Sequence, residues 1–71
     1  MSDETDMREQ IIEICAEALI QRGVAGVDRR SLFHDPAIAG EFLVLLRDCR
    51  PLPVVLSLIR EVERVRAAAG G

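Results

Sequence analysis

Cys15, His34 and Cys49 are the residues of this sequence best suited to act as a nucleophile, a base or a soft metal ligand. Structural zinc sites usually take four such ligands in close pairs, whereas these three stand alone and far apart in the chain. Cys15 also lies within an apolar helical pattern, where desolvation raises the pKa of a thiol and leaves it unreactive. The sequence therefore predicts no metal, no cofactor and no Cys–His catalytic pair.

The rest of the sequence offers no other catalytic machinery. The segment Gly23-Val24-Ala25-Gly26 lacks the lysine and the strand-to-helix context of a phosphate-binding loop. A chain of 71 residues is also too short to enclose a substrate pocket of ordinary size. We therefore expect a protein that is not an enzyme and that takes no small-molecule substrate.

Composition and length predict one small folded domain of marginal stability. The sequence is 49% hydrophobic and 30% charged, which is typical of folded chains rather than disordered ones. A domain this small buries only about 60% of its unfolded surface and is usually reinforced by disulfides, a metal or oligomerisation. Residues 1–10 are acidic and polar, unlike a secretory signal, so we expect a cytoplasmic protein with reduced cysteines. We also expect no membrane span, which leaves oligomerisation as the reinforcement.

The apolar periodicity predicts an all-α fold, a small three-helix domain with one additional short helical turn. A flexible acidic tail at residues 1–4 should precede a single helical domain at 5–69. The three helices should span about 5–22, 36–49 and 53–68.

A few residues set these boundaries. Gly23 should end the first helix in the left-handed conformation. Asp35 should cap the second helix, with Pro36 at its first position, and the segment Pro51-Leu52-Pro53 should form a stiff corner before the third. A short helical turn at about 29–33 should place two apolar side chains in the core, Leu32 and Phe33.

The first helix should bury one apolar stripe. Its members recur every three or four residues, as the inner face of an amphipathic helix requires. The expected stripe consists of Met7, Ile11, Ile14, Cys15, Ala18 and Leu19, with Ile12 at its edge.

The second and third helices carry more apolar surface than a single core needs. Residues 42–46 are five consecutive apolar residues, and adjacent side chains on a helix point about 100° apart. Some of them must therefore meet a second surface, which in so short a chain should belong to another protein molecule. We expect a helical-bundle homodimer or a complex with a different protein, and a role as a small adaptor, inhibitor or regulatory subunit. The expected interface residues are Leu43, Val44, Val54 and Leu56.

Charge is unevenly distributed along the chain. The net charge is −3, yet acidic residues dominate the first helix and arginines the remainder. One acidic strip follows a single side of that helix, at Asp6, Glu9, Glu13 and Glu17. It is either a solvated face or a docking strip for a basic partner.

The alternative function is a dimeric DNA-binding regulator resembling a helix-turn-helix protein. Its third helix would enter the major groove with its N-terminal residues, but residues 53–56 are apolar and offer no donor to a base edge. The negative net charge also argues against nucleic acid as the partner. In this interpretation the contacts would come from Arg29, Arg30, Arg47 and Arg50.

Overall fold

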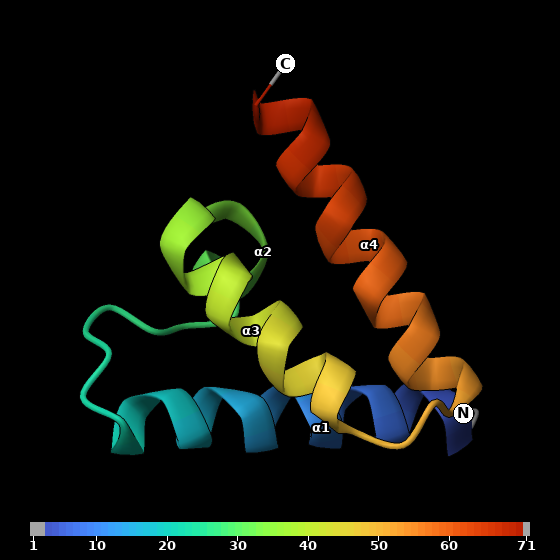
Figure 1. The fold of residues 1–71 in the computed structure, drawn as a ribbon. Coiled ribbons are helices and arrows are strands. Elements are labelled where there is room, and N and C mark those ends of the chain that lie inside the picture. Colours follow the sequence, from blue (N-terminus) through green and yellow to red (C-terminus); the bar gives the residue numbers. More distant parts are fainter. Residues whose placement is uncertain (1–2, 71) are drawn as a thin grey trace.

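The computed structural model describes residues 3–70 and contains α-helices without strands in that range. The elements are α1 (Asp3–Gln21), α2 (Ser31–His34), α3 (Pro36–Asp48) and α4 (Pro53–Gly70). In Figure 1, α3 and α4 diverge from a shared corner like the arms of a V. Helix α1 runs along the closed end of the V, and α2 lies beside the open end of α3. The predicted all-α fold, with three longer helices and one short turn, is confirmed.

The expected acidic tail is shorter than predicted. Its residues 1 and 2 lie outside the described part of the chain, but Asp3 and Glu4 already belong to α1. Acidic side chains at Asp3, Glu4 and Asp6 occupy the first turn. Negative charge near a helix N-terminus stabilises the helix by interacting with its dipole, so these residues extend α1 toward the N-terminus.

Glycine ends α1 as the sequence predicts. Gly23 has φ of 86°, a conformation that costs little only for glycine. Its N–H donates to the carbonyl of Ile20 at 3.0 Å, and the N–H of Val24 donates to the carbonyl of Leu19 at 3.1 Å. These two bonds form a Schellman motif, which satisfies carbonyls that the helix itself leaves unpaired.

The start of α3 also follows from local chemistry. The Asp35 carboxylate accepts hydrogen bonds from the N–H groups of Ala37 at 3.0 Å and Ile38 at 3.2 Å. Pro36 occupies the first position of the helix, where its missing N–H costs nothing. After Asp48, the prolines at 51 and 53 prevent a continuous helix and turn the chain into α4.

The core lies where all four helices meet. Phe42 is fully buried at its centre and makes an edge-on contact with Phe33, with ring centroids 5.7 Å apart. Helix α2 contacts both α3 and α4, and α1 contacts both of them as well. The buried residues are Ile12, Cys15, Leu19, Leu32, Ile38, Ala39, Phe42, Leu43, Leu46, Val54, Val55, Leu58 and Val62.

The predicted stripe of α1 is right for Cys15 and Leu19, which are buried, but the buried face is turned toward Ile12. Ile12, expected at the edge, is 3% exposed, whereas Ile14, expected inside, is 67% exposed. Met7 is also exposed. Two adjacent apolar rows run along α1. The rest of the chain buries the row of Ile12, Cys15 and Leu19 and covers the other row only in part.

Candidate functional site

Two of the four expected interface residues belong to the core. Leu43 and Val54 are 2% and 4% exposed, so the premise that the chain's own packing does not need them is wrong. The reason is that α1 and α2 both contact α3 and α4, which makes the buried face wider than one covering helix allows. Val44 and Leu56 remain available at the surface, with 52% and 47% of their areas exposed.

Val44 and Leu56 lie on the outer sides of α3 and α4. Arg47, one turn beyond Val44, forms an ion pair with Glu63 at 3.0 Å. Glu63 lies on the same side of α4 as Leu56, because the two residues are two helical turns apart. This ion pair joins α3 to α4, one turn from Val44 on α3 and two turns from Leu56 on α4. We call Val44 and Leu56 with this bridge the outer surface. A neighbouring concavity of about 280 Å³ is lined by Pro53, Leu56, Ser57 and Arg60.

A second exposed apolar surface follows α1. Met7 and Ile14 are seven residues apart and therefore lie on one side of the helix, with Ile11 and Ala18 partly buried along the same line. We call these four residues the α1 seam. At its N-terminal end, an apolar concavity of about 360 Å³ is lined by Asp3, Glu4, Met7, Leu52, Pro53 and Val54.

The acidic strip on α1 is partly used within the chain. Glu9 forms an ion pair with Arg29, and the hydrogen bonds from that guanidinium hold the pKa of the Glu9 carboxyl below its usual value. Asp6, Glu13 and Glu17 are exposed. The strip therefore retains three carboxylates that face solvent.

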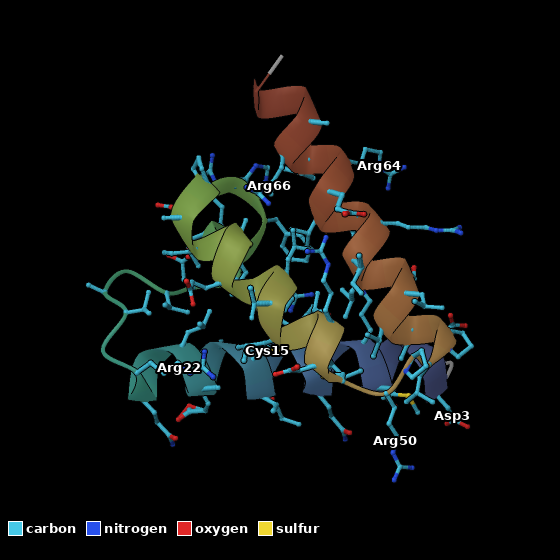
Figure 2. The ribbon with its side chains drawn as sticks, viewed as in Figure 1. Asp3, Cys15, Arg22, Arg50, Arg64 and Arg66 are labelled. Atoms are coloured by element: carbon cyan, nitrogen blue, oxygen red, sulfur yellow. The ribbon has the colours of Figure 1, made fainter. Side chains whose placement is uncertain are left out.

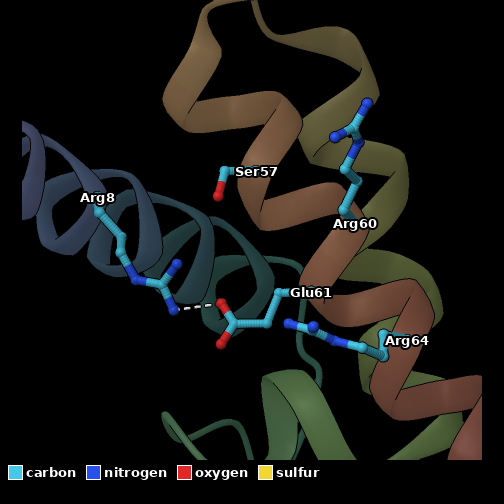
Figure 3. A pocket seen from close by; sticks show the side chains of 5 residues that line it. All are labelled: Arg8, Ser57, Arg60, Glu61 and Arg64. Atoms are coloured by element: carbon cyan, nitrogen blue, oxygen red, sulfur yellow. Dashed lines mark hydrogen bonds and ion pairs between the residues drawn. The ribbon is translucent and has the colours of Figure 1, made fainter.

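Arginines line a concavity between α1 and α4. Its volume is about 460 Å³, and its lining consists of Arg8, Ser57, Arg60, Glu61 and Arg64. Arg8 reaches across from α1 to form an ion pair with Glu61, as Figure 3 shows. Arg60 points away from that pair in the same view. The ion pair joins the two helices and neutralises part of the positive charge of the concavity.

The four arginines proposed as nucleic-acid contacts do not gather into one patch. Arg29 and Arg30 line a concavity of about 420 Å³ together with Arg8, Phe33, His34, Glu61 and Val65. Arg47 instead pairs with Glu63 on α4. Arg50 projects into solvent from the corner before α4, as Figure 2 shows.

Cys15, His34 and Cys49 do not form a site. Cys15 is 5% exposed, and burial raises the pKa of its thiol to about 11. Cys49 is exposed, and its Sγ donates to the Leu45 carbonyl at 3.3 Å, whereas His34 lies at the end of α2. Across residues 3–70, no three His, Cys, Asp or Glu side chains are grouped as metal ligands would be. Over the same residues, no helix combines the length and hydropathy of a membrane span.

The two cysteines should differ sharply in reactivity with an aromatic disulfide reagent. Thiol attack requires the thiolate and access for the reagent, and Cys49 has access whereas Cys15 has neither. We expect one thiol to react quickly in the native protein and the second only after denaturation. Cys49→Ala should remove the fast phase, and Cys15→Ala should retain it. Equal rates for both thiols would show that Cys15 is not protected.

Comparison with known proteins yields no relative. No protein-family model, no curated protein and no solved structure matches this chain. The function must therefore be inferred from the surfaces described above.

Proposed function

We propose that this protein is a non-enzymatic interaction module that binds protein chains through apolar helix surfaces, and that it works as a homodimer. One observation carries the proposal. Within residues 3–70, large apolar side chains are exposed at Met7, Ile14, Ile20, Val44, Leu52 and Leu56, each with at least 42% of its area accessible. Scattered apolar residues are normal on protein surfaces, but here most of them fall on two surfaces, the α1 seam with Leu52 and the outer surface.

Burial of these residues favours association. Covering a half-exposed Val or Leu side chain contributes about 1 kcal/mol, because full burial contributes about 1.5–3 kcal/mol. The same contact also stabilises the folded state of a small domain by mass action, because the partner binds the folded chain. The expected role is that of an adaptor, inhibitor or regulatory subunit.

Catalysis has no comparable support among the side chains. The nucleophile candidate Cys15 is buried with a raised pKa. The two arginine-lined concavities contain the Arg8–Glu61 ion pair, and the concavity beside Met7 is lined by Asp3, Glu4 and apolar residues. The DNA-binding alternative is weakened because two of its four arginines, Arg29 and Arg47, are each paired with a carboxylate.

The outer surface is the proposed contact for a second protein. We expect affinity purification with the tagged wild-type chain to recover a partner that the double variant Val44→Glu/Leu56→Glu does not recover. Glutamate at both positions should prevent burial of the surface, because desolvating an unpaired carboxylate is costly. Circular dichroism should show unchanged helicity, since both side chains are exposed.

The matched control is Ile20→Glu, which places the same charge at an exposed apolar residue on α1 away from both surfaces. This variant should recover the same partner as the wild type. Identical recovery by the double variant would contradict the assignment of the outer surface. Retention of the wild-type chain on duplex DNA at physiological salt would instead favour the DNA-binding alternative.

A further inference from the structure

The α1 seam has the residue spacing of a helix that pairs with another helix. Met7, Ile11, Ile14 and Ala18 follow one another at intervals of four, three and four residues, which is the spacing of inward-facing residues in a coiled coil. The seam lies beside the buried row of Ile12, Cys15 and Leu19 rather than within it. Ile11 and Ala18 are partly buried, but Ile14, at the middle of the seam, is 67% exposed, so the chain leaves much of this row uncovered.

The seam matches a second copy of itself in antiparallel orientation. In a two-fold pair each contact occurs twice, with the two residues exchanged between the copies. A two-fold axis midway between Ile11 and Ile14 places Ile11 against the partner's Ile14. The same axis places Met7 against the partner's Ala18, so that the largest side chain of the seam meets the smallest. Every member of the seam then has an apolar counterpart.

The charges at the two ends of α1 select this orientation. Glu4 and Arg22 are eighteen residues apart, which is about five turns, so they lie on the same side of the helix. Arg22 continues the helical path, because its N–H donates to the Ala18 carbonyl at 3.2 Å. Figure 2 shows Arg22 at the opposite end of α1 from Asp3. Antiparallel pairing brings Glu4 near the partner's Arg22, whereas parallel pairing brings like charges together.

The apolar concavity at the N-terminal end of α1 fits the same arrangement. Glu4, Met7 and Leu52 line it, and Leu52 is 42% exposed. In the antiparallel register, the C-terminal turn of the partner's α1 passes over this concavity. Pairing would therefore cover Leu52 together with the seam, and it would join opposite charges at each end.

We propose that a second copy of this chain is the occupant of the α1 seam, in an antiparallel α1–α1 pair with Glu4 beside the partner's Arg22. This inference rests on the proposed function and specifies the surface through which the protein binds itself. A single helix pair is smaller than a standard protein interface. The Kd of the dimer should therefore lie in the micromolar range. The outer surface stays free for a different protein.

The test is a charge exchange followed by sedimentation equilibrium over micromolar concentrations. The variants are Glu4→Arg, Arg22→Glu and the exchange Glu4→Arg/Arg22→Glu, with the wild type for comparison. Each single variant places like charges together at both ends of the pair and should weaken the dimer by roughly tenfold. The exchange variant restores opposite charges at both ends and should recover most of the wild-type affinity. Both substituted positions are exposed in the single chain, so helicity should be unchanged.

The outcomes separate this inference from the proposed function. A wild-type dimer that the single variants leave unchanged would overturn the α1 pair while leaving homodimerisation in place. Weakening by the single variants without recovery in the exchange variant would overturn the antiparallel orientation. A wild-type chain that is monomeric at every concentration would overturn both the α1 pair and the homodimer. Binding of a different protein at the outer surface is tested separately by the affinity purification.

Discussion

Phe42→Ala should leave most of the protein unfolded at room temperature. Phe42 is fully buried on α3, and its ring contacts Phe33 of α2 edge-on. Removing a buried phenylalanine ring typically costs about 3–5 kcal/mol, because transfer energy is lost and a cavity remains. A domain below about 80 residues rarely has more than about 3–5 kcal/mol of stability from its core. The loss should therefore approach the whole free energy of unfolding.

Urea denaturation followed by far-ultraviolet circular dichroism measures this effect. Leu56→Ala is the control, because Leu56 is nearly half exposed and alanine favours a helix. That variant should change the free energy of unfolding by no more than about 0.5 kcal/mol. Both variants should be compared at one protein concentration, since dimerisation also stabilises the folded chain. Equal midpoints for the two variants would mean that Phe42 is not at the centre of the core.

Ile14→Glu should convert the dimer to a monomer without unfolding it. Ile14 is 67% exposed in the single chain, so its own fold does not depend on this side chain. In the α1 pair it lies near the two-fold axis, and the substitution buries two carboxylates without partners. We expect the dimer to weaken by at least about a hundredfold, because an unpaired buried charge costs several kcal/mol.

Ile20→Glu is the matched control for this variant as well. Ile20 is 52% exposed on α1 but lies about 120° around the helix from Ile14, away from the seam. Its substitution should leave the molecular mass unchanged, and both variants should keep the helicity of the wild type. If Ile14→Glu keeps the wild-type mass, the seam is not where the copies meet.

Local chemistry made the helix boundaries predictable. Gly23 supplies a left-handed residue, and Asp35 supplies a carboxylate that accepts two backbone N–H groups. Pro51 and Pro53 separate the last two long helices. Each of these effects acts within a few residues of its cause, so it can be read from the sequence without knowledge of the tertiary fold.

The faces of the helices were harder to predict, because they depend on where the other helices lie. Helix α1 has two adjacent apolar rows, and periodicity alone does not distinguish the row containing Ile12 from the row containing Ile14. Similarly, Leu43 and Val54 became core residues because α3 and α4 are covered by α2 as well as by α1. The four-residue helix α2 was expected as a minor turn, but it contacts both α3 and α4. Within residues 42–46, Val44 is the most exposed residue.

The sequence pattern also could not predict the ion pairs that the arginines form. Arg8 meets Glu61, and Arg29 meets Glu9, across large separations in the chain. Spacing along one helix predicts pairs only between residues three or four apart. Of the four arginines in the DNA-binding alternative, Arg29 is paired with Glu9 and Arg47 with Glu63, on different helices.

Sedimentation equilibrium of the wild-type chain tests the central claim most directly, since the claim is that this protein works by apolar contact, first with itself. The account predicts a mass that rises with concentration toward twice the 7.8 kDa of one chain. A mass that stays at 7.8 kDa throughout the micromolar range would contradict it.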